Sequence, residues 1–126
     1  MHNRRMLVVD DERVIRFALR SYFSEQGFDV DCASERDEAL SLLERASYDI
    51  VIADLRLSGT TSEEGLDVIR VARERHLATR IILLTAYRTA SVDEKAHALG
   101  VDMLLQKPKP LPELAQTVFS LLAARN

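Results

Sequence analysis

The chain has 126 residues, of which 47% are hydrophobic and 29% are charged, so its size and composition are those of one compact domain. A net charge of −3 argues against the positively charged surface of a nucleic-acid-binding domain. The single cysteine excludes an internal disulfide and favours a cytoplasmic location. The apolar run at 6–9 is too short for a signal peptide or a membrane span. We therefore expect protein or small-anion partners, and neither direct DNA binding nor membrane association.

Short apolar runs alternate with longer stretches of helical periodicity, a pattern typical of a parallel α/β sheet. The apolar runs predict strands near 6–10, 28–33, 49–54, 80–85 and 101–106. The stretches between and after them predict helices near 12–26, 34–46, 63–76, 89–99 and 110–125. Because the strand at 28–33 alternates between apolar and polar residues, we expect it at an edge of the sheet.

The helix predicted near 12–26 has two chemically distinct faces. The apolar side chains expected to face the core are Val14, Ile15, Ala18, Leu19 and Tyr22. The other side carries Arg13, Arg16 and Arg20, with Phe17 beside Arg13. The simplest interpretation of this arginine stripe is a solvated face.

Ionic and hydroxyl side chains follow four of the five predicted strands. Asp10 and Asp11 end the first strand, Asp54 the third, Thr85 the fourth and Lys107 the fifth. In an open parallel sheet, ligands bind beyond the carboxyl ends of the strands, where these residues meet. The sequence therefore predicts a site at this edge.

The three aspartates need a cation among them. Two carboxylates about 4 Å apart repel by about 4 kcal/mol at an effective dielectric constant of about 20. Lys107 offsets one of the negative charges. A cluster of carboxylate oxygens also suits Mg²⁺, which can bind phosphate oxygens of the substrate at the same time. With four glycines and no phosphate-binding glycine loop, the chain is expected to hold phosphate through the metal, Lys107 and Thr85.

Asp54 is the expected nucleophile, because it projects singly from the central strand. An aspartate carboxylate attacks phosphorus to give an aspartyl-phosphate, and it needs no general base at neutral pH. Its reaction then depends on positioning and charge neutralisation by the metal and Lys107.

Four motifs in order resemble the receiver domain of two-component response regulators: MLVVDDE, YDIVIADLRL, RIILLTAY and LLQKP. The resemblance covers the whole chain, 1–126. It implies a single flavodoxin-like doubly wound domain with a five-stranded parallel sheet in the order 2-1-3-4-5. It also implies a cis bond between Lys107 and Pro108.

The resemblance further implies the role of each site residue. Mg²⁺ would be held by Asp10, Asp11, Asp54 and the backbone carbonyl of Arg56. Asp54 would accept a phosphoryl group from a phosphohistidine on a sensor histidine kinase or a histidine phosphotransfer protein, with Thr85 and Lys107 on the transferred group. The domain would act mainly as a signalling switch with slow autodephosphorylation; its output partner is not identified, and a homodimer is left open.

Three departures from the family pattern bear on switching. Leu104 stands where most receivers have an aromatic residue whose side chain moves inward. Ser58 replaces a usual proline and Gly65 arrives about three residues late, so 60–64 is interpreted as an insertion. Its acids, Glu63 and Glu64, would gate the site or form a solvated bulge, the interpretation we favour. Lys109 and Pro110 follow Pro108 where an aromatic residue often stands.

Other functions remain open at this stage. A degenerate receiver would keep the fold and bind partners without phosphorylation, which Leu104 and the altered loop favour and the intact acid set opposes. A small aspartyl phosphatase would place a second aspartate two residues after the nucleophile, where this chain has Arg56. In receivers the first helix contacts the kinase's histidine-bearing helices, so Phe17 and the arginines around it are an alternative docking patch.

Overall fold

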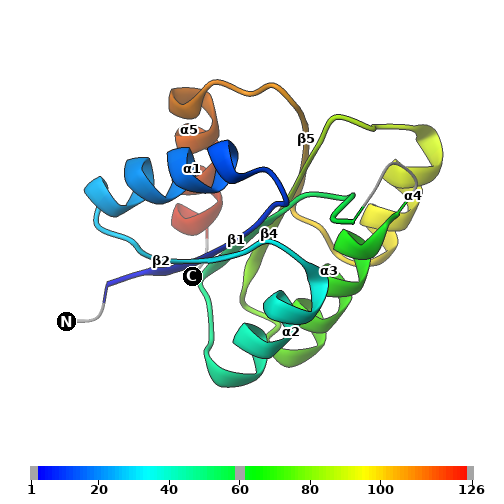
Figure 1. The fold of residues 1–126 in the computed structure, drawn as a ribbon, viewed down its shortest axis with the longest axis horizontal. Coiled ribbons are helices and arrows are strands. Elements are labelled where there is room, and N and C mark those ends of the chain that lie inside the picture. The colour runs from blue at the N-terminus through cyan, green and yellow to red at the C-terminus, as the bar shows by residue number, and fades with distance from the viewer. Residues whose placement is uncertain (1–2, 59–61, 125–126) are drawn as a thin grey trace.

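A five-stranded parallel sheet with helices on both faces forms the protein, as the computed structural model of residues 3–58 and 62–124 shows (Figure 1). The strands are β1 (Arg5–Val9), β2 (Asp29–Ala33), β3 (Ile50–Ala53), β4 (Arg80–Thr85) and β5 (Met103–Gln106). The helices are α1 (Arg13–Glu25), α2 (Arg36–Arg45), α3 (Glu64–Arg75), α4 (Ala90–Ala98) and α5 (Leu111–Ala123). The sheet order β2-β1-β3-β4-β5 confirms the expected doubly wound, flavodoxin-like fold, with β2 at an edge.

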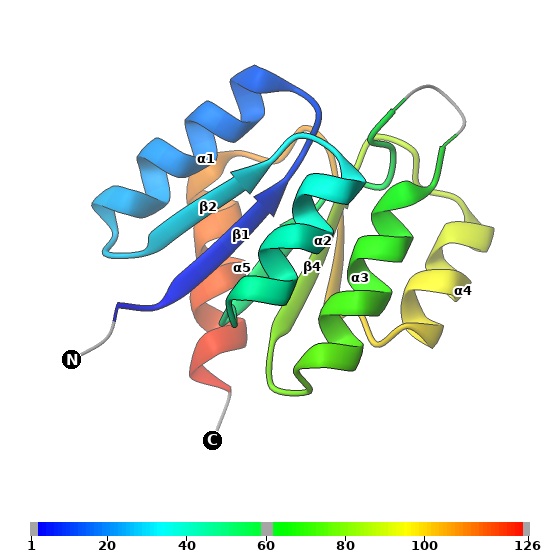
Figure 2. The same ribbon diagram turned by 60° about the horizontal axis from the view of Figure 1, so that its bottom comes forward.

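The strands bury side chains on both faces of the sheet. Along β1, Met6 and Val8 face one core cluster while Leu7 and Val9 face the other. Helices α1 and α5 cover the first of these clusters, and α2, α3 and α4 cover the second (Figures 1 and 2). Burial on both faces explains why β1, β3 and β4 are continuous apolar runs in the sequence. None of the helices in the described ranges is long and apolar enough to cross a membrane.

Glycines end two of the helices. Gly27 follows α1 with a φ of 95°, and Gly100 follows α4 with a φ of 80°. Residues other than glycine rarely adopt this left-handed conformation, which returns the chain toward the next strand. The short connections to β2 and β5 depend on these two positions.

The inner face of α1 differs in one respect from the sequence prediction. Leu19 and Phe23 are buried, whereas Val14 is 79% exposed, so its assignment to the core was wrong. The buried line runs through Ile15, Leu19 and Phe23, and Val14 lies about 100° around the helix from Ile15. Its side chain therefore joins the outer face of the helix.

An ionic network at the amino-terminal edge of the sheet connects α3, β4 and β5. Asp102 accepts hydrogen bonds from Arg73 and Arg80, both at 3.1 Å, and from the backbone N–H of Ile81 at 2.7 Å. Arg73 also donates to the carbonyl of Gly100 at 2.8 Å. Because Asp102 is shielded and has several charged donors, this network contributes more than an exposed ion pair.

We predict that Asp102→Asn lowers the free energy of unfolding by about 1 to 3 kcal/mol, because one carboxylate serves three donors. Urea denaturation measures the change. The matched control is Asp93→Asn, whose partner Arg88 is exposed and whose loss changes stability by at most about 0.5 kcal/mol. Equal effects of the two substitutions would contradict a special role for the network.

Candidate functional site

The predicted site residues lie together at the carboxyl edge of the sheet because the backbone ladder continues past the strand ends. Asp10 N–H donates to the carbonyl of Ala33 at 3.0 Å, and Asp54 N–H donates to the carbonyl of Val9 at 2.8 Å. Lys107 N–H likewise donates to the carbonyl of Thr85 at 2.9 Å. The backbone of each of these residues is thus held by hydrogen bonds of the sheet, although the residue lies just beyond the end of its strand.

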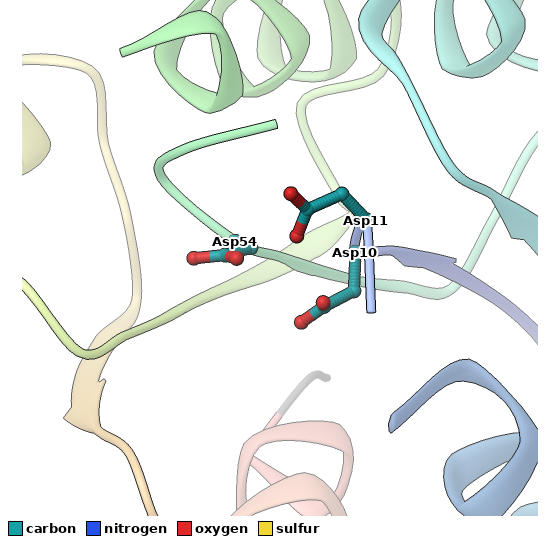
Figure 3. A group of neighbouring side chains, drawn as sticks. All are labelled: Asp10, Asp11 and Asp54. Atoms are coloured by element: carbon teal, nitrogen blue, oxygen red, sulfur yellow. The ribbon is translucent and has the colours of Figure 1, made fainter. Parts of the chain in front are cut away.

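The carboxylates of Asp10, Asp11 and Asp54 form a cluster at the ends of β1 and β3 (Figure 3). One oxygen from each lies within 4.8 Å of one from each of the others. Asp10 and Asp54 are buried and Asp11 is exposed, so the cluster opens to solvent on the Asp11 side. The sequence prediction that these three residues meet agrees with this geometry.

Lys107 is the cation of the cluster. Its Nζ donates to Asp10 at 2.8 Å, to Asp54 at 3.2 Å and to Glu12 at 3.3 Å. The ammonium therefore connects β5 to β1 and β3. The peptide bond that follows, between Lys107 and Pro108, is cis, as the family resemblance predicted.

Burial and charge set the ionisation of this cluster. The pKa of Asp54 is raised to about 6, chiefly by burial and also by the charges of Asp10 and Asp11, while the charge and hydrogen bond of Lys107 lower it. Burial also raises the pKa of Asp10 above its usual value, against the hydrogen bond from Lys107. For Lys107, burial lowers the pKa, but the hydrogen bond and charge of Asp10 and those of Asp54 reverse this, so its pKa is raised. The lysine therefore stays protonated at neutral pH.

The donor set fits a hard divalent cation. The site offers three carboxylate oxygen donors and no nitrogen or sulfur ligand, and such oxygens are the ligands that Mg²⁺ prefers. Burial, the largest cause of the raised pKa values of Asp10 and Asp54, makes their carboxylates costly to ionise unless a cation is near. The backbone carbonyl of Arg56, the fourth ligand implied by the resemblance, stays a prediction.

A cavity of about 710 Å³ adjoins the acidic cluster. Its polar side chains include Asp54, Lys107, Arg56 and Lys109, and its apolar wall comes from α1 and α5 and includes Leu19 and Leu114. The cavity gives a ligand access to Asp54 from solvent.

Thr85 forms no hydrogen bond with the carboxylates of Asp10, Asp11 and Asp54. Its side chain is fully buried, and its Oγ1 accepts a hydrogen bond from the backbone N–H of Tyr87 at 3.0 Å. The sequence placed Thr85 correctly at the end of β4. Its contact with a phosphoryl group stays a prediction.

The start of α3 packs directly on the backbone of Asp54. A Cβ on Gly65 would collide with the carbonyl of Asp54, and the Gly65 N–H donates to the carbonyl of Leu55 at 2.9 Å. Only glycine fits this close approach. The position of α3 is therefore coupled to that of the Asp54 backbone.

The acids before Gly65 are not the freely solvated bulge that the sequence favoured. Glu63 is half-buried and accepts a hydrogen bond from Lys95 of α4 at 2.8 Å. Glu64 lies 3.8 Å from Arg36 of α2. Both acids thus connect α3 to its neighbouring helices. The remaining part of the proposed insertion includes Thr60 and Thr61, which lie outside the described residues.

Two contacts in the site were missing from the sequence prediction. Glu12 binds Lys107, and Arg16 donates to the backbone carbonyl of Asp10 at 2.9 Å. The position of Glu12 directly after the two aspartates was a signal that more than two acids gather here. Nothing local indicates its pairing with Lys107, because the two residues are 95 positions apart in the chain.

Comparisons with known proteins agree with this geometry. The family model described as the response regulator receiver domain matches residues 6–119. The transcriptional regulatory protein ResD of Bacillus subtilis (strain 168) is 36% identical over 118 residues, which are 94% of this chain. This chain spans only 48% of the length of ResD.

Solved structures give the same result. The response regulator protein TrrA of Thermotoga maritima, in complex with Mg(2+)-BeF, is 35% identical with a TM-score of 0.79, covering 94% of this chain and 98% of that one. The CheY-like receiver domain protein of Methanospirillum hungatei JF-1 has a TM-score of 0.91 at 21% identity, covering 98% of this chain and 97% of that one. The second comparison shows likeness of fold.

We predict that Asp54→Asn raises the free energy of unfolding by about 1 to 3 kcal/mol at pH 7 without divalent cations. Its pKa is about 6 when folded against 3.8 as an unperturbed group, so ionisation at neutral pH opposes folding. The penalty is fully present above pH 6 and disappears as the pH falls toward 4, where Asp54 is protonated in both states. The advantage of the variant must therefore shrink on acidification.

Urea denaturation at pH 7 and pH 4.5 measures this difference. Asp93→Asn, in the exposed ion pair with Arg88, serves as the control and is expected to show no comparable gain. A variant less stable than the wild type at pH 7 would contradict the assignment of a destabilising charge to Asp54.

Proposed function

This chain belongs to the response regulator receiver family of two-component systems, and we propose that its Asp54 accepts a phosphoryl group in a Mg²⁺-dependent reaction. Receiver domains are phosphorylated by histidine kinases, so the proposed donor is a phosphohistidine on a kinase or on a histidine phosphotransfer protein. The observation that most supports this proposal is that three carboxylates and one ammonium lie together at the carboxyl edge of the sheet, from Asp10, Asp11, Asp54 and Lys107. The cytoplasmic location expected from composition stays a prediction.

In the proposed reaction, an oxygen of Asp54 attacks the phosphorus of the phosphohistidine. An O–P bond forms and the P–N bond breaks, with its electron pair left on the imidazole nitrogen. Because the other ring nitrogen already carries a proton, the donor histidine is a neutral imidazole once the P–N bond has broken. A pKa of about 6 leaves Asp54 mostly ionised at pH 7, so no general base is needed.

Lys107 is proposed to bind the transferred group. Its Nζ already contacts Asp54 at 3.2 Å, and its raised pKa keeps it charged while the phosphoryl oxygens approach. Asp10, Asp11 and Asp54, with the carbonyl of Arg56, would hold Mg²⁺. When bound, that ion would supply charge neutralisation for the phosphoryl oxygens.

Thr85 is proposed to respond to the phosphoryl group. We expect the Thr85 side chain to move toward the phosphoryl group as its O–H donates, and this movement would stretch or break the hydrogen bond from the Tyr87 N–H. The segment between β4 and α4 would rearrange, which shifts the population of an active surface. Leu104 is half-buried and packs against the core on the α4 side, so the switching surface here is proposed to work without the usual aromatic residue on β5.

The outer face of α1 is the proposed contact for the phosphodonor protein. Val14 and Phe17 are 79% and 72% exposed, and they lie on the helix that follows the acidic cluster directly. Arg13 and Arg20 flank them in the sequence, so the patch is apolar with a positively charged rim. Such a surface fits an acidic helix with exposed apolar residues.

Incubation with Mg²⁺ and acetyl phosphate, followed by intact mass, tests phosphorylation. We expect the mass gain of one phosphoryl group on the wild type and none on Asp54→Asn, because only that carboxylate is the nucleophile. Asp11→Asn is expected to slow the gain, since it removes a carboxylate from the metal site. Asp37→Asn, at an exposed position of α2, is the control.

The same experiment separates the alternatives. No mass gain on the wild type would support a degenerate receiver that binds partners without phosphorylation. Steady release of phosphate with no accumulated adduct would support an aspartyl phosphatase. Either result would overturn the proposal.

Phe17→Ala tests the docking face. We expect transfer from a phosphorylated histidine kinase to slow about tenfold, because an aromatic anchor is lost from the interface. The rate with acetyl phosphate should not change, since the Phe17 side chain is exposed and does not line the cavity at Asp54. Leu77→Ala is the control. The Leu77 side chain is 83% exposed and lies in the turn before β4, at the opposite end of the sheet from the site. Equal slowing by both substitutions would exclude a specific α1 interface.

A further inference from the structure

Arg56 has an unusual environment beside the site. It is the second residue after Asp54, and its guanidinium carbon lies 3.6 Å from the centre of the Tyr87 ring. Its Nε is buried and has no hydrogen-bond partner. Within residues 3–58 and 62–124, no carboxylate forms an ion pair with Arg56. The ring thus holds the guanidinium in place, and none of its N–H groups donates to another described residue.

This arrangement is costly unless a ligand uses it. A guanidinium is always charged and carries several N–H donors in a rigid fork. A buried charged donor without an acceptor lowers the stability of the fold. Stacking on a tyrosine stabilises the guanidinium by about 0.5 to 2 kcal/mol, but it gives the N–H donors no acceptor. The stack fixes the orientation of the fork, so little entropy is lost when an anion binds to it.

Arg56 lines the same cavity as Asp54 and Lys107. The two cations differ in how far they are already engaged. Lys107 donates to three carboxylates, whereas Arg56 donates to none of the described residues. A phosphoryl group entering this cavity must therefore compete for Lys107 but not for Arg56. The guanidinium fork also matches a phosphoryl group in shape, because it binds two oxygens at once.

We propose that Arg56 is a donor-positioning residue: its guanidinium binds oxygens of the dianionic phosphoryl group while the donor is still intact, and Tyr87 holds the guanidinium ready. This proposal rests on the proposed function of Asp54. Arg56 brings the donor into the cavity before transfer, and Lys107 and the metal site act on the transferring group. Arg56 acts on the binding of the donor. Its presence therefore lowers the half-saturating donor concentration and leaves the maximal rate little changed.

The test follows phosphorylation over a range of acetyl phosphate concentrations with Mg²⁺, using intact mass. We expect Arg56→Gln to lower the rate at low donor concentration about tenfold, the effect of one charged bidentate contact. The maximal rate should change little. Arg56→Lys keeps the charge without the fork and should recover part of the loss. Tyr87→Leu, which removes the ring but keeps an apolar side chain, should weaken donor binding about threefold. High salt screens the guanidinium charge, so it should reduce the difference in rate between each variant and the wild type.

Arg88→Gln is the matched control, because Arg88 lies in the same loop as Tyr87 and its guanidinium pairs with Asp93 at 3.1 Å. It should behave as the wild type. A readout independent of turnover is the nuclear magnetic resonance signal of each arginine Nε–H in ¹⁵N-labelled protein with Mg²⁺. Added inorganic phosphate should shift the Arg56 signal and leave the Arg88 signal unchanged.

The proposal is overturned if Arg56→Gln and Arg88→Gln show the same dependence on donor concentration and the Arg56 signal does not respond to phosphate. That result differs from a failure of the proposed function, in which the wild type itself gains no phosphoryl group on Asp54. A wild type that is phosphorylated normally, with no effect at Arg56, rejects only the donor-positioning role.

Discussion

The ammonium of Lys107 among the acids is the interaction on which the site depends. It contacts Asp10, Glu12 and Asp54, which follow two different strands. Burial, with the charges of Asp10 and Asp11, raises the pKa of Asp54 to about 6 despite this ammonium, and three carboxylates still face a single lysine. The same excess of buried negative charge, which opposes folding, makes the cluster suited to a divalent cation. Function here derives from charge that the fold holds together against repulsion.

The parallel sheet is what holds these charges in place. Because every strand points the same way, all of the carboxyl ends lie at one edge, and backbone hydrogen bonds continue to Asp10, Asp54 and Lys107 themselves. Two-sided burial in the helix layers makes that edge rigid. Around it, the structure places contacts that connect the Asp54 backbone to the helices: Gly65 at the start of α3, and Glu63 paired with Lys95 on α4. A change at Asp54 therefore has direct routes to α3 and α4.

Much of this was predictable from the chain alone, and the errors have physical causes. The parallel α/β sheet and the meeting of the three aspartates followed from apolar periodicity and from the rule for strand ends, whereas the strand order followed from the resemblance to receiver domains. Val14 was wrongly placed in the core because the helical stripe was drawn one residue too wide. Glu63 was interpreted as solvated because its partner, Lys95, is 32 residues away and belongs to another helix. Periodicity describes which face a residue occupies, and it carries no information about which side chain stands opposite.

The sequence by itself determined the parallel α/β sheet and the residues that reach its carboxyl edge, because these depend on local patterns and on strand direction. Its four motifs also indicated the receiver family, and that resemblance implied the doubly wound strand order. Only the tertiary structure decided how the charges pair. It showed that Lys107 binds Glu12 as well as the aspartates, that Thr85 is turned toward the Tyr87 amide, and that Arg56 stacks on a ring with its Nε unpaired. Such pairings form between segments far apart in the chain, where distances of a few ångströms set the energy, and no sequence pattern encodes those distances.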